Sequence, residues 1–377
     1  MFQLKQRILI IDNSPDTTGA LKSILNYCVF ARNQFDFVFI FPKDSRASRR
    51  VRKEQFQVIE FPIMEISKSF RNLILYLPRL IQNSIRLNKV IEENQIALVH
   101  VNDFYNLIAI ASKAFGNNFI LTTHVRFMPD RFPFLKKIWI NLNLKYADAI
   151  VCVSGAVKQF LPNHPKVHVI HDGFLEQQGP YIPKPEEDII QLVYISHYIK
   201  GKGQDYAVEA FHLAFRQNGN IRLKFVGGDM GMNKNKDFKK SLIKRVEELD
   251  LAHVVQFSGQ VDNVRKELEH GDILLNFSES ESFSMTCLEA LSFGVPLIVS
   301  DSGGPSELFV HEESGMLIPN RDINSMAAAI VRLSKDGNLR RKFSMNGLKF
   351  VKDRFASENT YGVLLNLQLR LLGRNAS

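Results

Sequence analysis

Residues 273–301 read ILLNFSESESFSMTCLEALSFGVPLIVSD, and this segment contains the pattern that decides the fold. ILLNFS (273–278) is a short apolar run typical of a buried strand, and a polar loop follows it. Residues 285–293 have the spacing of a helix and end before a glycine and a proline, which commonly stop helices. A second apolar run, VPLIVSD (295–301), comes next. The segment therefore predicts a strand, a helix and another strand.

Similar apolar runs occur along the whole chain, separated by helical or loop segments. Most are apolar almost throughout rather than alternating, which indicates parallel sheets covered on both faces. In the first half the runs are RILIID (7–12), FDFVFIF (35–41), QVIEFP (57–62), ALVHVN (97–102), FILTTH (119–124), AIVCVS (149–154) and VHVIHDG (167–173). In the second half they are IIQLVYIS (189–196), RLKFVGG (222–228), VVQFSG (254–259), ILLNFS (273–278) and VPLIVSD (295–301). The fold class predicted is α/β, with two Rossmann-like doubly wound domains.

The length of the chain supports two domains, because 377 residues exceed what one core usually holds. Residues 174–188, FLEQQGPYIPKPEED, break every period and are typical of a linker between domains. We therefore expect one domain at 1–173 and a second at 189–356, followed by a C-terminal helix at 357–377. Ligands of open α/β sheets bind at the carboxyl ends of the strands, so two such domains facing each other predict a deep cleft.

The composition excludes several classes of protein. Apolar residues make up 45% of the chain and charged residues 23%, which is a globular composition without a low-complexity tract. The amino terminus resembles no secretory leader and no window is apolar enough to span a membrane, so we expect a cytoplasmic protein. Cys28, Cys152 and Cys287 are odd in number and far apart, which predicts buried thiols rather than disulfides or metal ligands.

The positive charge is concentrated in the first half. Residues 1–180 hold 23 Lys+Arg and 14 Asp+Glu, whereas residues 181–377 hold 25 of each. A basic half can indicate nucleic acid, an anionic membrane surface or a phosphate-bearing substrate.

Two carboxylates flank the start of the helix predicted at 285–293. Glu281 lies at or before its first turn and Glu289 lies about two turns inside, so about 12 Å along the axis separates them. This distance is too long for an acid and base acting on one bond. It suits two carboxylates that accept hydrogen bonds from opposite ends of a long polyol, with an anion at the helix N-terminus between them. The alternative is that Glu281 only complements the helix dipole and Glu289 is a solvated position.

The second half resembles the family-4 retaining glycosyltransferases of the GT-B fold. Its resemblance rests on Glu281-x7-Glu289 followed by Ala290, Gly294-Val295-Pro296 and Gly303-Gly304-Pro305-Ser306-Glu307, and on KGQDYAVEAF (202–211), KFVGG (224–228) and VVQFSGQV (254–261). The first half adds the Gly19 loop, ALVHVND (97–103), TTHVRF (122–127), VCVSGAV (151–157) and VIHDGF (169–174), in the expected order. The resemblance implies an acceptor-binding first domain, a nucleotide-sugar-binding second domain and a C-terminal helix that returns to the first domain.

The resemblance also implies roles for individual residues. Glu289 would hold the ribose hydroxyls and Glu281 those of the donor sugar, while Lys202 would neutralise the diphosphate as it leaves. The backbone amides of Phe283 and Ser284 would share that task.

In the first domain, Gly19 would let its loop approach the phosphates or the acceptor, and His124 would lie over the reacting sugar. Taken alone, a histidine at a strand end is more often structural, and Lys202 is most often a solvated lysine.

Three positions depart from the family pattern. Ser196-His197 replace the usual Gly-Arg, and an imidazole does not carry the permanent charge of a guanidinium, so His197 is an uncertain substitute for the phosphate-binding arginine. Ser282 and Ser284 replace the two glycines of Glu-Gly-Phe-Gly and provide hydroxyls that can cap the helix. Asp172-Gly173 replaces the commoner Asn-Gly.

The predicted activity is retaining transfer of a sugar from a UDP- or GDP-linked donor to a glycan or lipid-linked acceptor, in bacterial surface polysaccharide, lipopolysaccharide or glycolipid synthesis. The resemblance implies a front-face mechanism in which an oxygen of the donor's β-phosphate takes the acceptor proton. No Asp-x-Asp motif is present, so we expect no metal and no cofactor besides the nucleotide sugar.

Two other readings belong to different classes. A nicotinamide-dependent dehydrogenase is disfavoured because no Gly-x-Gly-x-x-Gly follows the first strand. A basic scaffold that binds nucleic acid or membrane, with no transferase activity, is the alternative that the charge count supports. For the transferase we expect no nucleic acid. Residues 69–93 and 126–139 mix apolar residues with cations, which suits either an anionic inner-membrane surface or ordinary helices beside the cleft.

Overall fold

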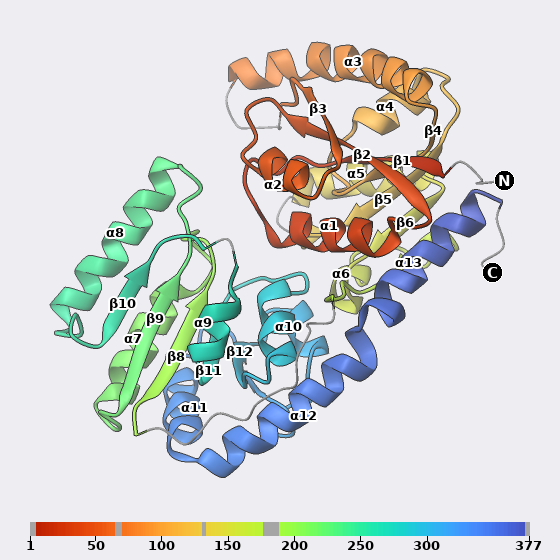
Figure 1. Ribbon diagram of the computed structural model, residues 1–377. Helices are drawn as coiled ribbons and strands as arrows, with labels where there is room; N and C mark the ends of the chain where they lie inside the picture. Colours follow the sequence, from red (N-terminus) through yellow and green to blue (C-terminus); the bar gives the residue numbers. More distant parts are fainter. Residues whose placement is uncertain (1–4, 65–69, 130–132, 176–187, 262, 374–377) are drawn as a thin grey trace. The chain divides into compact units, whose positions relative to one another are not determined.

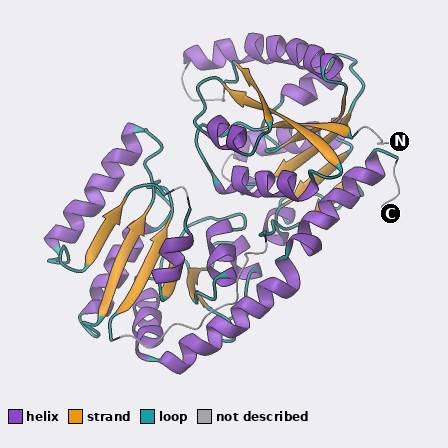
Figure 2. Ribbon diagram, in the orientation of Figure 1, coloured by secondary structure: helices purple, strands orange, loops and turns teal. Residues whose placement is uncertain are grey.

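The computed structural model describes residues 5–64, 70–129, 133–175, 188–261 and 263–373. The chain forms two compact units, residues 1–175 with 357–377 and residues 176–356 (Figure 1). Each unit is built around a parallel sheet with helices on both of its faces (Figure 2). Most of the segment interpreted as a linker, 174–188, lies outside the described residues.

In the described part of the first unit, seven parallel strands form a sheet in the order β3-β2-β1-β4-β5-β6-β7. The strands are β1 (Gln6–Ile11), β2 (Phe35–Pro42), β3 (Gln57–Phe61), β4 (Ile96–Val101), β5 (Ile120–Val125), β6 (Ala149–Cys152) and β7 (Val167–Val169). The helices are α1 (Gly19–Ala31), α2 (Ala47–Lys53), α3 (Phe70–Glu93), α4 (Ile108–Ala114), α5 (Pro133–Tyr146), α6 (Gly155–Lys158) and α13 (Ser357–Leu371).

In the described part of the second unit, six parallel strands form a sheet in the order β10-β9-β8-β11-β12-β13. The strands are β8 (Ile190–Ile195), β9 (Ile221–Val226), β10 (Val255–Ser258), β11 (Ile273–Asn276), β12 (Leu297–Ser300) and β13 (Met316–Ile318). The helices are α7 (Gln204–Phe215), α8 (Asn233–Glu248), α9 (Arg265–His270), α10 (Met285–Ser292), α11 (Ile323–Lys335), α12 (Gly337–Phe355) and the short 3-10 helix Gly304–Glu307.

The structure confirms the predicted fold class and the parallel strands, with differences at element ends. β13 was not predicted, because three residues are too few to show a period. β7 ends at Val169 instead of continuing to Gly173. All three cysteines are buried thiols, as predicted. In the described residues, no helix combines the length and the apolar character needed to cross a membrane.

The last helix of the chain is part of the core of the first unit. α13 packs against α1, and buried Leu364 and Leu367 join the same apolar cluster as Leu21 and Ile24. Two buried hydroxyls add polar contacts. The Tyr361 hydroxyl donates to the Gly173 carbonyl at 2.6 Å.

The second of these hydroxyls belongs to Tyr27 on α1. It donates to Gln368 Oε1 on α13 at 2.6 Å. Because a buried polar group without a partner costs stability, these contacts fix how α13 docks on the sheet.

α10 begins at a residue whose backbone is unusual for its type. Ser284 has φ +83°, in the left-handed region that favours glycine. Its hydroxyl accepts hydrogen bonds from Cys287 N at 3.3 Å and from Asn276 Nδ2 at 3.1 Å, so it caps the helix and contacts the end of β11. The hydroxyl contacts offset the backbone strain.

This balance predicts an unusual order of stability at position 284. Ser284→Ala loses the cap and keeps the strained backbone, so we expect a loss of about 1–2 kcal/mol in the free energy of unfolding. Ser284→Gly also loses the cap but relieves the strain, so it should be about 1 kcal/mol more stable than Ser284→Ala. Urea unfolding measures both values.

Ser292, in the last turn of the same helix, is the matched control. Its φ is not positive, so there the alanine variant should be about 1 kcal/mol more stable than the glycine variant. If Ser284→Ala is as stable to unfolding as Ser284→Gly, the backbone at position 284 is not strained.

Candidate active site

The candidate site lies where the strand order of the second sheet reverses. β8 and β11 are neighbours, but the chain continues from β8 to β9 on one side and from β11 to β12 on the other. Parallel strands end at the same edge of a sheet, so the loops that follow β8 and β11 leave from adjacent points. Open α/β sheets bind ligands at such a reversal.

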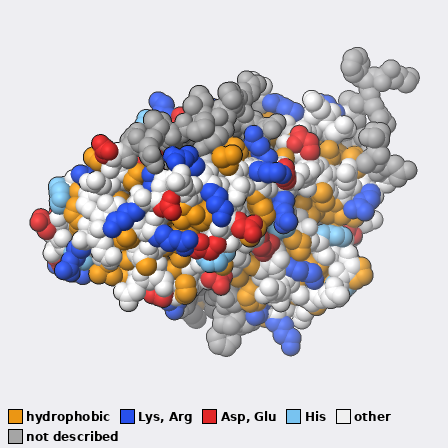
Figure 3. Space-filling view, turned by 90° about the horizontal axis from the view of Figure 1, so that it is seen from below, with side chains coloured by type: hydrophobic (Ala, Val, Ile, Leu, Met, Phe, Trp, Pro, Cys, Tyr) orange, Lys and Arg blue, Asp and Glu red, His pale blue; other side chains and the backbone are white. Residues whose placement is uncertain are grey.

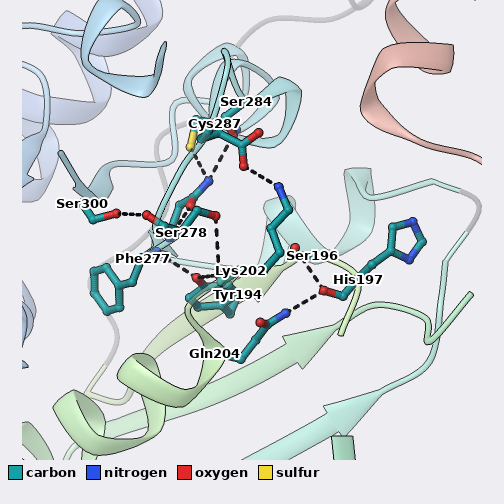
Figure 4. A network of polar contacts seen from close by, with 12 residues as sticks. Tyr194, Ser196, His197, Lys202, Gln204, Phe277, Ser278, Ser284, Cys287 and Ser300 are labelled. Carbon is teal, nitrogen blue, oxygen red and sulfur yellow. Dashed lines mark hydrogen bonds and ion pairs between the residues drawn. The ribbon is translucent and has the colours of Figure 1, made fainter. Parts of the chain in front are cut away.

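Lys202 and Glu281 come from these two loops and form an ion pair. Lys202 Nζ lies 2.6 Å from Glu281 Oε2, although 79 residues separate them in the sequence (Figure 4). The two side chains are 29% and 16% exposed, so the pair is accessible from solvent. The structure therefore places a cation and a carboxylate together at the reversal of the sheet.

A tyrosine hydroxyl holds the two loops against each other. Tyr194, on β8, donates to the Lys202 carbonyl at 2.5 Å and accepts from Phe277 N at 2.8 Å, just after β11 (Figure 4). Burial raises the pKa of this hydroxyl well above its usual value, so it keeps the proton that it donates. Its two hydrogen bonds fix the backbone that carries Lys202.

Two glycines permit the close approach of these backbones. Gly203 has φ +80°, and a Cβ there would come within 2.0 Å of the Phe277 carbonyl oxygen. At Gly304 a Cβ would come within 2.1 Å of the Ser282 carbonyl oxygen. Both contacts are too short for any side chain, so each position requires glycine.

The loop before α10 is fixed by backbone pairing. Glu281 N donates to the Ser302 carbonyl at 3.0 Å, and Gly304 N donates to the Glu281 carbonyl at 2.8 Å. The Phe283 side chain is buried and packs on Phe355 of α12, with ring centroids 5.7 Å apart. The carboxylate of Glu281 is therefore carried on a backbone that is held from both sides.

The other residues that the sequence singled out in the second unit lie on the same loops or on α10. Glu289 is partly exposed on α10. The His197 ring follows β8, and its Nδ1 lies 3.3 Å from the Gly228 carbonyl oxygen. Because a carbonyl only accepts, this contact requires Nδ1 to donate. Figure 4 shows the His197 ring to the side of the Lys202 side chain, so the two are not paired in the way Lys202 and Glu281 are.

Gly19 and His124 lie in the first unit. Gly19 is exposed at the first residue of α1, after Thr18, whose hydroxyl caps the helix by accepting from Leu21 N at 3.2 Å. His124 is buried near the end of β5, and both of its ring nitrogens lack a hydrogen-bond partner among the described residues. Burial, reinforced by the positive charge of Arg126, lowers the pKa of His124 well below its usual value. Its imidazole is therefore neutral near pH 7.

Several residues that support the site were not identified from the sequence. Asn276 Oδ1 accepts from Ser278 N at 3.1 Å, and Ser300 Oγ donates to the Ser278 carbonyl at 2.6 Å. Tyr194 was also missed, because it reads as an apolar strand residue. A polar residue at the end of an apolar strand, such as Asn276, was the available signal. Burial raises the pKa of Cys287 to about 12, so this nearby thiol is not a nucleophile.

The site has the chemistry to bind an anion and hydroxyl groups together. Lys202 carries a cation, Glu281 carries an acceptor beside it, and the loop of Glu281 leads into the first backbone N–H groups of α10. Among the described residues, no group of three His, Cys, Asp or Glu side chains is arranged to hold a metal ion.

Two family models match the chain. The model described as Glycosyltransferase Family 4 matches residues 19–174, and that described as Glycosyl transferases group 1 matches residues 181–350. Among curated relatives, N-acetyl-alpha-D-glucosaminyl L-malate synthase of Bacillus anthracis is 31% identical over 167 residues, which are 44% of this chain and 42% of that enzyme. The lipopolysaccharide core biosynthesis glycosyltransferase LpsD of Rhizobium meliloti is 31% identical over 129 residues, 34% and 38% of the two chains. The chain thus matches less than half the length of these relatives.

A solved structure shares the fold over nearly the whole chain. HepE of Anabaena, in complex with UDP-glucose, has a TM-score of 0.83 and 18% sequence identity, and the match covers 97% of this chain and 99% of HepE. Both halves of the chain match a model, and the fold agrees with that of the GT-B glycosyltransferases. The chain belongs to the family-4, group 1 glycosyltransferases.

Proposed function

We propose that the protein is a retaining glycosyltransferase that moves a sugar from a UDP- or GDP-linked donor to a glycan or lipid-linked acceptor. The observation that carries the proposal is the accessible Lys202–Glu281 pair at the reversal of the second sheet. LpsD is named as a glycosyltransferase of lipopolysaccharide core biosynthesis, and HepE was solved with UDP-glucose. We place the reaction in bacterial surface polysaccharide, lipopolysaccharide or glycolipid synthesis. A scaffold without transferase activity is not favoured by the family matches.

The second unit would bind the donor and the first unit the acceptor. Glu289 accepts hydrogen bonds from the ribose hydroxyls and Glu281 from the donor sugar. Lys202 and the amides of Phe283 and Ser284 face the diphosphate, where negative charge develops as it leaves. His197 takes the position of the family's arginine, and its neighbour Lys202 carries the permanent charge.

In this assignment Gly19 lets its loop approach the acceptor, and His124 is a catalytic residue that lies over the reacting sugar. Both ring nitrogens of the neutral His124 are buried and lack a hydrogen-bond partner among the described residues, so one can donate a hydrogen bond and the other can accept one. His124 therefore orients a sugar hydroxyl and does not act as an acid.

The reaction proceeds on one face of the donor sugar. The acceptor oxygen bonds to the anomeric carbon from the side on which the bond to the β-phosphate breaks. An oxygen of that phosphate takes the acceptor proton, so the configuration is retained. In this mechanism Lys202 and the dipole of α10 stabilise the leaving diphosphate, and no divalent cation is required.

The first test is a donor panel. The donor that binds should raise the melting temperature, because a ligand that binds only the native state stabilises it. At a donor concentration one hundred times the Kd, the free energy of unfolding should rise by about 2.7 kcal/mol. We expect one of UDP-glucose, UDP-galactose, UDP-N-acetylglucosamine or GDP-mannose to do so, with GTP and NADH as controls. With that donor, NMR should show a product of retained anomeric configuration, in a reaction that EDTA does not stop. No stabilisation by any donor contradicts the proposal, and a rate restored only by manganese or magnesium contradicts the metal-free mechanism.

The second test concerns Lys202. If this lysine stabilises the leaving diphosphate, Lys202→Ala should lower kcat by about 100-fold or more and raise the donor KM far less, since the contact is strongest in the transition state. His197→Ala should have a much smaller effect at pH 8. Steady-state kinetics with the donor selected by the panel measure both.

Lys244→Ala on α8 is the matched control for removing one positive charge, because Lys244 is 78% exposed and far along the chain from both loops. It should leave kcat unchanged. A Lys202→Ala enzyme with near-normal kcat would show that the diphosphate contact is assigned to the wrong residue.

Charged side chains of both signs are mixed on the one face shown in Figure 3, where basic side chains are interspersed with acidic and apolar ones. In the segment 126–139, Arg126 and Trp139 are buried, so these two residues do not contribute to a lipid-binding surface. Residues 130–132 of that segment lie outside the described residues.

Helix α3, which Figure 1 labels, comes from the segment 69–93 and exposes an apolar stripe. Ile74, Leu77, Ile81 and Ile85 recur every three or four residues and are between 39% and 61% exposed, so they share one face. Lys89 is exposed in the turn after Ile85. An apolar face with a cation beside it suits an anionic membrane surface, and we propose that α3 docks there.

The third test removes the stripe. Ile74→Gln, Leu77→Gln and Ile85→Gln combined should lower the fraction of protein that sediments with phosphatidylglycerol vesicles by about tenfold or more, because apolar burial in the lipid is lost. Met345→Gln on α12, where the side chain is 66% exposed, is the matched control and should bind as the wild type does. Equal binding of the triple variant, or equal binding to neutral vesicles, contradicts docking through α3.

A further inference from the structure

A buried ion pair in the first unit connects four segments at the carboxyl edge of the sheet. Arg126, just after β5, donates from Nη1 to both oxygens of Asp172 at 2.7 and 2.9 Å. The two side chains are only 3% and 6% exposed. Both side chains are buried and their charges are hydrogen-bonded to each other, so the pair acts within the protein.

Each member of the pair makes a further contact toward the loop between β1 and α1. On one side, Arg126 Nε donates to Asn102 Oδ1 at 2.5 Å, and the Asn102 amide donates to Asp12 Oδ2 and to the Ala20 carbonyl. On the other side, the hydroxyl of Ser23, on α1, donates to Asp172 Oδ1. The pair therefore holds the residue that begins the loop and the helix that follows it.

The segment held between these contacts is 13–18, which leads to Gly19. Asp12 also accepts from Ser14 N at 2.7 Å, so the start of the loop is fixed directly by the same carboxylate that contacts Asn102. Buried charges are stable in a protein only when their remaining donors and acceptors are satisfied. Asn102 accepts a hydrogen bond from Arg126, and Ser23 donates one to Asp172. Asn102 also donates to Asp12 and Ser23 lies on α1, so these two residues connect the ion pair to the β1–α1 region.

The sequence departure at Asp172 has a physical reason in this arrangement. Asp172-Gly173 stands where the family commonly has Asn-Gly. An asparagine cannot neutralise a buried guanidinium, whereas the carboxylate of Asp172 forms a charge-assisted contact with two oxygens. The charge of Asp172 is therefore the counterpart of the buried charge of Arg126.

We propose that Arg126 and Asp172 are positioning residues that clamp the β1–α1 loop, and with it Gly19, in the geometry needed on the acceptor side. The inference rests on the proposed function for the role of the Gly19 loop. The clamp itself is a property of the first unit and is testable without substrate.

The substrate-free experiment measures hydrogen exchange. In Arg126→Met and in Asp172→Asn, the backbone amides of residues 13, 14 and 16–18 should exchange about tenfold faster or more, while those of β1 should exchange as in the wild type. If a single variant fails to fold because it leaves one buried charge unpaired, the double variant removes both charges and should still show the faster loop exchange. Unchanged exchange in the folded variants overturns the proposal.

The control is an ion pair elsewhere in the same unit. Lys113 Nζ lies 2.8 Å from Asp148 Oδ2, away from the β1–α1 loop, so Lys113→Met should leave the exchange of residues 13–18 unchanged. If it accelerates that exchange as much as Arg126→Met does, the effect is general destabilisation and the clamp is wrong.

The kinetic experiment uses the best donor of the panel. The affinity for that donor's nucleoside diphosphate, measured by calorimetry, should be unchanged in the variants, because its proposed contacts are in the second unit. Release of nucleoside diphosphate in the presence of acceptor should fall by about tenfold or more below the melting temperature, since small displacements of positioning groups are costly. Arg126→Lys keeps the positive charge but lacks the planar guanidinium with its several donors. Its rate of nucleoside diphosphate release should therefore lie between those of the wild type and Arg126→Met. Normal turnover with a loosened loop would overturn the positioning role, whereas a wild type without any transfer would count against the proposed function alone.

Discussion

The second unit depends on one constraint, which is that the loops after two adjacent parallel strands must occupy neighbouring space. After β8 the chain continues to β9 on one side, and after β11 it continues to β12 on the other side. No strand of the described sheet therefore lies between the two loops. Their backbones approach so closely that Gly203 has no room for a Cβ beside the Phe277 carbonyl. The Tyr194 hydroxyl bridges the same two loops. Lys202 and Glu281 meet because this packing brings their backbones together, and their charges stabilise the arrangement.

The sequence predicted those features that depend on local pattern. Strands were visible because parallel strands buried on both faces read as apolar runs, and the helix at Met285 was visible from its spacing and its terminating glycine. The sequence also indicated Lys202 and Glu281 individually. Their contact was not predictable, since it depends on which strands are neighbours. The buried pair of Arg126 was not identified, because its partner, Asp172, is 46 residues away and lies in a run that was predicted as a strand.

The two cation–carboxylate pairs differ in exposure, and this difference separates their roles. Arg126 and Asp172 are 3% and 6% exposed, and further hydrogen bonds satisfy them inside the protein. Breaking such a pair by removing one partner leaves a buried charge, at a cost of about 3–5 kcal/mol. Lys202 and Glu281 are 29% and 16% exposed, so water screens them and solvent can replace either partner at a smaller cost. The first pair is suited to holding structure and the second to exchanging partners.

This exchange has a consequence for the proposed reaction. A diphosphate carries more negative charge than one carboxylate, so it competes effectively with Glu281 for Lys202. In the proposed reaction Lys202 would turn to the diphosphate, and the Glu281 carboxylate would then accept hydrogen bonds from the sugar. The cation and the carboxylate would thus have partners on the two halves of one donor. Because their 2.6 Å contact already holds both groups at one point of the unit, only their partners would change when the donor binds.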